Sequence, residues 1–373
     1  MNIKRSIFIF SIFFSLPIFS QVYSDKVVGK KNAEVIDSLK VTDYPYSLPI
    51  WGQKATEKGF SLPYSAGVSV NTFWTEAELN ISNLYVGFNG GTQYNLDEVI
   101  RFNSSYAEAN SINIRPDVWV FPFLNVYGIF AKVQSSTSIN AGVWLPVNEN
   151  DWTQVATIKS KVDFDLTTYG VGITPTIGVG GGWLALDMNM TWSFADELED
   201  PAFAFVFDPR VGKTFKFDKP DNNVNIWVGA MRVKLDTQTK GSLPLGDIFS
   251  TEEAQAKIDN GYVKLAEGQT NVDNWWNSLS SIEQKNPVNV AKYETANKAL
   301  DTGEQLLNGL DGAIDTLETS TVQYSLEKEQ ANMWNFLVGG QYQHNKHWMF
   351  RAEVGFLGTR TQVMAGMQYR FGL

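Results

Sequence analysis

Two small groups of side chains in this sequence have the residue types and the spacing for chemistry. Asp163 and Asp165 are two residues apart, which places both carboxylates on one face of a β-strand. Because their like charges repel, one carboxyl of such a pair can keep its proton and act as a general acid. His344 and His347 are three residues apart, and two imidazoles at that spacing can bind one metal ion. A catalytic site and a metal site are therefore the first two hypotheses.

Neither group has the further residues that its chemistry needs. No third ligand stands near the histidine pair, and these are the only two histidines, so a histidine-dependent triad is not expected. Cysteine is absent, which excludes thiolate ligands, a cysteine nucleophile and disulfides. The run GVGGGW at 178–183 has a tryptophan where the dinucleotide fingerprint needs its third glycine. We therefore expect no catalytic residue, no metal site and no cofactor, and we interpret Asp163 and Asp165 as members of a salt-bridged network.

The N-terminus has the parts of a secretory signal peptide. Lys4 and Arg5 form a charged start, residues 6–19 are apolar and uncharged, and a small residue, Ser20, precedes the expected cleavage point. Residues 1–20 are therefore excluded from the fold. The net charge is −10, and residues 247–330 alone hold 15 acidic and six basic residues. An exported acidic chain is not expected to bind nucleic acid, because contact with phosphates needs a basic face.

Alternating side chains run through the chain and continue to its last residue. In 361–373 the odd positions are mostly apolar and the even positions are polar or glycine, with Met364 as the exception. The segments 347–357 and 334–343 alternate in the same way and are separated by short breaks, which predicts an antiparallel meander. After the first twenty residues no apolar run reaches the ~18 residues of a membrane-spanning helix. The chain beyond its leader is therefore expected to consist mainly of strands with one apolar face.

Segment length and the placement of aromatic side chains indicate which apolar medium these strands contact. Strands of a soluble β-sandwich average about five or six residues, whereas strands of a membrane barrel run ~9–11 residues with aromatic girdles at both interfaces. The segments here run about ten residues, which favours an all-β, antiparallel transmembrane β-barrel over residues 61–373. The predicted lipid-interface aromatics are Trp183, Trp227, Tyr342, Trp348, Tyr369 and Phe371. The predicted lumen-lining charged residues are Arg115, Asp117, Asp163, Asp165, Asp187, Arg232, Lys234, Arg351, Glu353 and Arg370.

The final residues, MQYRFGL, resemble the closing-strand signature of bacterial outer-membrane β-barrels, which place apolar and aromatic residues at alternate positions counted back from the C-terminus. The match includes Leu373, Phe371 and Tyr369, although such proteins usually end on phenylalanine. The stretches PIWGQKATEKGFSLPYSAGVSV and RPDVWVFPFLNVYGIF are similar to those of outer-membrane proteins whose family has no assigned activity. The resemblance implies a location in the bacterial outer membrane and contact with its lipid and lipopolysaccharide. It also implies insertion by the outer-membrane assembly machinery through the C-terminal strand.

Counting back from the C-terminus gives about twelve strands, an even number as a single-chain bacterial barrel requires. They are 65–75, 80–89, 100–107, 110–122, 124–135, 162–175, 183–194, 203–217, 224–236, 334–343, 347–357 and 361–373. Because the alternation is weaker before residue 110, ten strands is the alternative. Residues 21–60 precede the first strand and form either a periplasmic arm or a plug in the lumen.

The longest interruption of the strands, residues 240–330, has the pattern of helices. Ser250 and Glu253 form a capping box at the start of one helix, and Leu306, Leu310 and Ile314 have the spacing of an amphipathic helix. The strand count places this acidic insert in an extracellular loop. The insert either shields the rim of the barrel or binds an extracellular ligand or protein.

Three functions fit a barrel of this kind. The expected one is a porin-like passage for small solutes through a polar lumen. The alternative is a closed barrel that anchors the helical insert as an extracellular interaction module, because a lumen of this size is close to one that side chains fill. A weaker alternative is an outer-membrane enzyme that acts on lipid or glycan.

Overall fold

The computed structural model places most of the chain, and its gaps are short after residue 40. The described residues are 25–26, 37–38, 40–146, 152–196, 198, 200–217, 221–235, 238–247, 251–314, 316 and 319–373. The predicted signal peptide, residues 1–20, lies outside the described residues.

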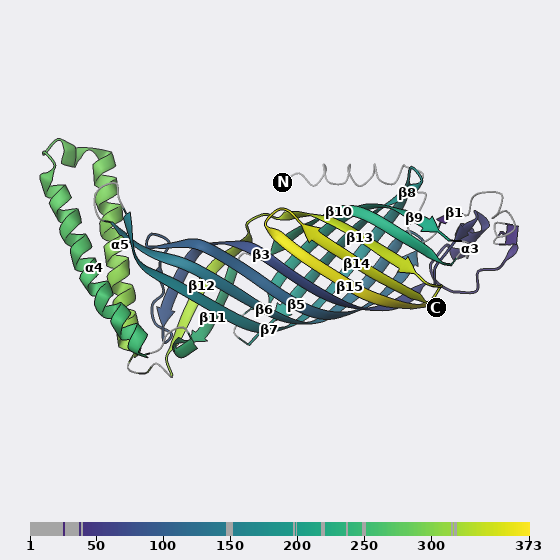
Figure 1. The fold of residues 1–373 in the computed structure, drawn as a ribbon, viewed down its shortest axis with the longest axis horizontal. Helices are drawn as coiled ribbons and strands as arrows, with labels where there is room; N and C mark the ends of the chain where they lie inside the picture. The colour runs from purple at the N-terminus through teal and green to yellow at the C-terminus, as the bar shows by residue number, and fades with distance from the viewer. Residues whose placement is uncertain are drawn as a thin grey trace.

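Ten antiparallel strands close into a barrel (Figure 1). The last strand pairs with the first, and the first also pairs with its successor, so the ring has no free edge. The ten strands are β3 (Ala66–Phe88), β5 (Ile100–Phe121), β6 (Leu124–Pro146), β7 (Trp152–Val179), β8 (Gly182–Phe194), β9 (Ala202–Lys216), β10 (Asn223–Leu235), β13 (Trp334–Gln343), β14 (Trp348–Phe356) and β15 (Arg360–Phe371). We call the end of the barrel at the C-terminus the terminal end and the opposite end the helical end.

The all-β antiparallel barrel is confirmed, with ten strands in the ring as in the alternative count. The predicted strands 65–75 and 80–89 are the two halves of β3, and 100–107 and 110–122 are the two halves of β5. These strands, with β6 and β7, have 22 to 28 residues, about twice what a membrane crossing needs. At ~3.3 Å per residue, β7 extends over about 90 Å.

The four long strands reverse their polarity about halfway along. On the terminal half of β6 the outward face is apolar, and Phe130 is 51% exposed there. On the other half of β6 the inward residues, including Ile139 and Val143, are the apolar ones. In β7, Tyr169 faces outward in the terminal half, whereas Phe164 faces inward in the helical half. The outward apolar surface therefore covers one half of each long strand, and the other half has a polar outer face.

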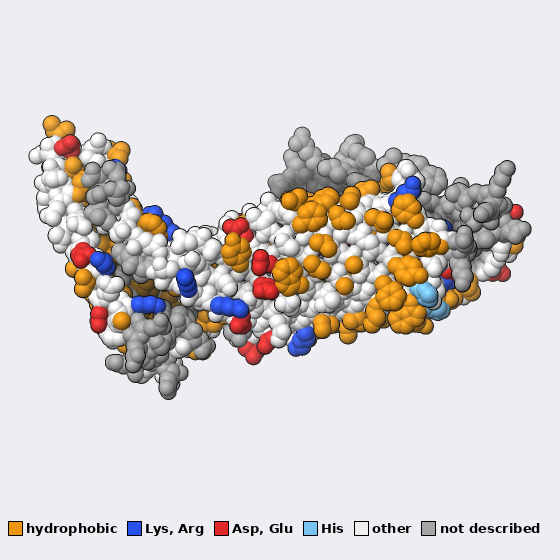
Figure 2. All heavy atoms as spheres, viewed as in Figure 1, with side chains coloured by type: hydrophobic (Ala, Val, Ile, Leu, Met, Phe, Trp, Pro, Cys, Tyr) orange, Lys and Arg blue, Asp and Glu red, His pale blue; other side chains and the backbone are white. Residues whose placement is uncertain are grey.

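An apolar band surrounds the terminal half of the barrel. The four strands β8, β13, β14 and β15 have 9 to 13 residues, close to the length of a bilayer crossing. Figure 2 shows hydrophobic side chains over the strands near the C-terminus, bordered by acidic and basic side chains toward the helical end. Closure, strand length and this band together are the architecture of an outer-membrane β-barrel.

The predicted insert, 240–330, contains two long helices and two strands. The strand β12 (Thr321–Gln330) pairs with the helical half of β3, and β11 (Gln238–Pro244) pairs with β12. Between them, α4 (Thr251–Ser278) and α5 (Pro287–Ile314) form a hairpin that projects from the barrel (Figure 1). The remaining short elements are β4 (Tyr94–Asn95), η2 (Leu245–Asp247) and η3 (Glu283–Lys285). No helix among the described residues is long and apolar enough to cross a membrane.

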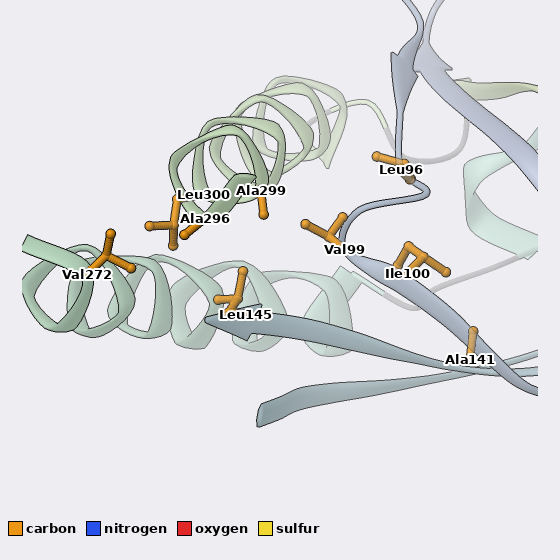
Figure 3. Close-up of a cluster of buried hydrophobic side chains, with 9 residues drawn as sticks. All are labelled: Leu96, Val99, Ile100, Ala141, Leu145, Val272, Ala296, Ala299 and Leu300. Atoms are coloured by element: carbon orange, nitrogen blue, oxygen red, sulfur yellow. The ribbon is translucent and has the colours of Figure 1, made fainter. Parts of the chain in front are cut away.

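A hydrophobic core joins the helical hairpin to the long strands. Val272 of α4 and Ala299 and Leu300 of α5 pack toward Val99 and Leu145 at the ends of the strands (Figure 3). Each fully buried aliphatic side chain of this kind contributes about 1.5–3 kcal/mol. The hairpin is therefore attached to the barrel by burial as well as by the chain.

The segment before the barrel lies at the terminal end. Leu48 N–H donates to the C-terminal Leu373 carbonyl at 3.3 Å, and Ile50 N–H donates to the Val120 carbonyl at 2.8 Å. This segment contains α3 (Gly52–Glu57) and β2 (Phe60–Ser61), which pairs with β1 (Asp25–Lys26). No described residue before Ser69 lines the cavity of the lumen. The described residues that form these bonds therefore contact the strand ends at the terminal end of the barrel.

Candidate functional site

The inward faces of the ten strands enclose a cavity of about 520 Å³ in the lumen. Most of the residues that line it have hydroxyl, amide or charged side chains, because each strand turns its polar alternate positions inward in the terminal half. The cavity extends from Thr75 and Gln330 toward the helical end to Asp117 and Trp183 at the terminal end. Apart from Arg360, which lies beside Gln330, the charged members gather in the terminal part, where they form the candidate site.

Arg210 of β9 is the centre of the charged network. Its guanidinium lies 3.6 Å from the Asp187 carboxylate of β8 and 3.2 Å from the Glu353 carboxylate of β14, and it also bonds to Asp208. Glu353 accepts a second ion pair from Arg351 at 3.2 Å. Burial of these charges would be strongly unfavourable without partners, so the network is satisfied mainly by its own members.

A second group of contacts extends the network across the lumen to β5 and β6. Arg115 lies 3.7 Å from Asp187 and has its guanidinium 3.2 Å from the centre of the Tyr127 ring. Asp187 also accepts hydrogen bonds from the Tyr127 hydroxyl and, at 3.0 Å, from the Thr174 hydroxyl. One carboxylate therefore connects groups from four strands.

A third group closes the network at the seam between the first and last strands. Arg370 of β15 donates to the Asp117 carboxylate of β5 at 2.9 Å. Asp117 also accepts from Asn125 at 2.7 Å and from Gln368. Four arginines thus face four carboxylates, and the network carries no net charge when all are ionised. The charges that line the cavity are these eight, Arg115, Asp117, Asp187, Asp208, Arg210, Arg351, Glu353 and Arg370, together with a fifth arginine, Arg360 of β15, which bonds to Gln330 and Asn335.

The structure places six of the ten predicted lumen charges in this cavity. They are Arg115, Asp117, Asp187, Arg351, Glu353 and Arg370. The prediction is wrong for the other four. Asp163 and Asp165 face outward on the helical half of β7, where Asp163 is 75% exposed and lies 3.8 Å from Lys161. In the half of β7 beyond the apolar band the polar face is the outer one. Asp163 and Asp165 therefore face outward and not into the lumen.

The prediction exchanged the two faces of β10, so that residues facing lipid were assigned to the lumen. Arg232 and Lys234 point outward, because they share a face with Ile226, which is 52% exposed, and with Val228. The inward face of β10 includes Met231 and Val233 in its helical half. Both faces of this strand are apolar over much of its length, so alternation alone does not decide which one contacts lipid.

Trp183 and Trp227, predicted at the lipid interface, are instead buried in the lumen. They lie on either side of Gly212, with their ring centres 6.1 Å apart, and Gly339 lies opposite Trp227 on the next strand. A methyl group on either glycine would overlap an indole ring. The glycines make room for the large rings, and the strand register that places them opposite the tryptophans is what gives the inward orientation. The other predicted aromatics, Tyr342, Trp348, Tyr369 and Phe371, face outward.

Two central members of the network, Asp208 and Arg210, were missed. They stand in FAFVFDPRVGKTF, where phenylalanines fill the alternate positions and face outward. Charged residues at the other positions of such a strand must face a polar interior. Tyr127, which bonds Asp187, was missed as well, because it has the same residue type as the lipid-interface aromatics.

The histidine pair lies in the turn between β13 and β14. His347 has its Nδ1 2.8 Å from the Arg370 carbonyl oxygen and stacks on the Tyr369 ring, with centres 5.3 Å apart. Among the described residues no group of three or more His, Asp or Glu side chains has the arrangement of a metal site. His347 therefore packs against the terminal end of β15, and His344 contacts Tyr342 of β13.

The chain resembles several solved structures of outer-membrane proteins at low sequence identity. No family model matches the chain, and no curated protein matches it. The chain is similar to the transport unit of the autotransporter AIDA-I from Escherichia coli, at 8% identity and a TM-score of 0.33, over 92% of this chain and 100% of that chain. It is also similar to the toluene transporter TbuX of Ralstonia pickettii, at 10% identity and a TM-score of 0.27, over 83% of this chain and 90% of that chain.

A third similar structure is the outer membrane protein Omp33 of Acinetobacter baumannii, at 9% identity and a TM-score of 0.21, over 83% of this chain and 99% of that chain. Scores this low carry no argument about function. The assignment as an outer-membrane β-barrel follows from the closed strand pairing, the apolar band and the C-terminal strand.

Proposed function

We propose that the protein is a passage for small polar solutes across the outer membrane, with the charged network as its constriction. The observation that carries the proposal is the cavity of about 520 Å³ in the lumen of the barrel, lined mainly by polar residues. A barrel of about eight strands is filled by its own side chains, whereas ten strands leave more interior space. The long side chains of the network narrow this space at the terminal end.

The composition of the constriction favours a class of solute. The network balances four arginines with four carboxylates, and Arg360 leaves the cavity with one positive charge in excess, so a preference between small ions would favour anions. Its donors and acceptors suit solutes that form many hydrogen bonds. We propose small neutral or zwitterionic molecules as the solutes.

Uptake into vesicles tests this proposal. The protein is refolded into lipid vesicles, and swelling is followed with neutral sugars of increasing size. The proposal expects entry of the smallest sugars and exclusion of larger ones, with small anions entering at least as fast as equally small cations. Vesicles that swell no faster than protein-free vesicles with every solute would reject the passage.

A second candidate is a closed barrel that presents the helical hairpin to a ligand or protein. It is favoured by apolar side chains exposed around α4 and α5, since Val263, Ile282 and Val288 are all more than half exposed. We propose no catalytic role, because each carboxylate of the network contacts an arginine. We also propose that the apolar band contacts outer-membrane lipid and lipopolysaccharide, and that β15 engages the assembly machinery.

A further inference from the structure

A second cavity, which we call the apolar chamber, lies at the helical end between the long strands and the hairpin. Its volume is about 340 Å³, within the range of about 300–1,000 Å³ that small-molecule sites occupy. Side chains from β3, β5, β6, β7, β11 and β12 form its walls, and α4 and α5 cover it. The aliphatic and aromatic members include Leu84, Val86, Ile100, Ile139, Val143, Ile158, Phe164, Leu265, Leu306, Leu310 and Leu326.

The charged groups of the chamber are all positive. Lys257, Lys264 and Lys328 line it, and no carboxylate does so among the described residues. The Lys264 ammonium lies 2.8 Å from the carboxylate of Glu267. Lys328 has no ion pair within the described part of the chain, and its ammonium lies 5.8 Å from the centre of the Phe164 ring. An apolar cavity with an unneutralised cation has the chemistry to hold an anion that carries an apolar group.

Lys328 lies at the boundary between the two cavities. The inward residues of β12 run from Val322 and Leu326 to Lys328 in the chamber, and Gln330, the next inward residue, lines the polar lumen. Glu329 is on the opposite face of the strand because successive side chains alternate. Burial lowers the pKa of Lys328, since the apolar surroundings disfavour its ammonium form. A bound anion would offset that cost.

We propose that the apolar chamber binds a small amphipathic carboxylate, with the carboxylate on Lys328 and the hydrocarbon part among the aliphatic side chains beneath the helices. A hydrocarbon without an acid group would leave the lysine without a bound anion. This site is distinct from the passage through the lumen. Its occupancy is measured by binding, whether or not the barrel conducts.

Octanoate and 1-octanol are matched probes, because they have the same chain and differ in the head group. Binding is measured on the full-length protein in lipid nanodiscs, with empty nanodiscs as the background. We expect the wild type to bind octanoate at least tenfold more tightly than octanol. Lys328→Met should lower octanoate affinity at least tenfold and leave octanol affinity unchanged or higher, whereas Lys328→Arg should retain octanoate. Lys159→Met, which removes an exposed lysine from the outer face of β7, is the matched control and should bind both probes as the wild type does.

A variant that fills the chamber locates the bound molecule. Leu306 lines the chamber from α5, and Leu306→Trp should remove binding of both probes. Equal octanoate affinity in wild type and Lys328→Met would overturn the proposal, as would a Leu306→Trp variant that binds octanoate like the wild type. Equal affinities of the wild type for octanoate and octanol would also overturn it, and this comparison needs no variant.

Discussion

The indole Nε1 of Trp227 on β10 donates a hydrogen bond to the Glu353 carboxylate of β14 at 2.8 Å. The bond passes over Gly339 of β13, the strand that lies between them. Trp227 therefore fixes one oxygen of a carboxylate that also pairs with Arg210 and Arg351. The Arg351 guanidinium lies 4.9 Å from the centre of the same indole ring. The packing of Trp227 and the pairing of Glu353 with its arginines thus depend on each other.

Removal of one charge from this network should cost more than removal of a pair. Glu353→Gln removes the carboxylate that Arg210 and Arg351 share. Breaking a buried ion pair in this way lowers the free energy of unfolding by about 3–5 kcal/mol. The double variant Arg351→Gln/Glu353→Gln keeps the network neutral and should recover most of that loss. Urea unfolding in vesicles, followed by tryptophan fluorescence, measures both. A double variant less stable than Glu353→Gln would contradict the balance of charges described above.

Two adjacent glycines on β13 should differ in their tolerance of a methyl group. Gly339 faces the Trp227 ring, so Gly339→Ala forces the ring to move and should lower the free energy of unfolding by about 1–3 kcal/mol. Gly340 faces away, and a methyl group there meets only the Asn225 carbonyl oxygen at 3.4 Å. Gly340→Ala should therefore unfold at nearly the wild-type urea concentration. Equal stability of the two variants would show that the indole does not occupy this position.

The orientation of β10 can be measured directly, because the chain has no cysteine. A spin label on Ile226→Cys should be accessible to oxygen dissolved in the lipid, since Ile226 is exposed on the apolar band. A label on Asn225→Cys should be shielded from it, because Asn225 is 3% exposed and lies in the lumen. The reversed pattern would restore the face assignment made from the sequence.

Octanoate binding should depend on pH through Lys328. The titratable groups that share the chamber with it are Lys257, Lys264 and Tyr324, and no described carboxylate does. Because burial lowers the pKa of Lys328, octanoate binding should be lost as pH rises through that lowered value, at a lower pH than an ordinary lysine would give. Arginine stays charged at such pH, so Lys328→Arg should shift the loss to higher pH. The affinity of both proteins, measured from neutral to alkaline pH, tests this; loss at the same pH in both would contradict it.

Alternation predicted the barrel well where strands are short and one face is clearly apolar. In β14 and β15 the assigned outward residues, including Trp348, Val354 and Val363, are exposed as expected. The method fails where a strand leaves the apolar band. There the apolar face changes from outside to inside, so β3 and β5 each resemble two strands and Asp163 is assigned to the wrong face.

The network and the chamber were harder to predict, because both depend on register between strands far apart in sequence. Asp117 meets Arg370 only because β15 closes on β3 beside β5. Lys328 gains its role from β12, a strand within the segment that the sequence predicted to be helical. A search for glycines opposite large aromatics would have needed that register as well.

Single-channel conductance tests the central claim most directly. The protein is refolded into a planar bilayer and compared with Arg351→Ala/Glu353→Ala, which removes two side chains from the constriction without changing its net charge. The matched control is Lys161→Ala/Asp163→Ala, an opposite-charge pair with the same spacing on the outer face of β7. We predict a small, stable conductance for the wild type and the control, and a larger one for the lumen variant. No conductance in any of the three proteins would contradict a passage and favour the closed barrel.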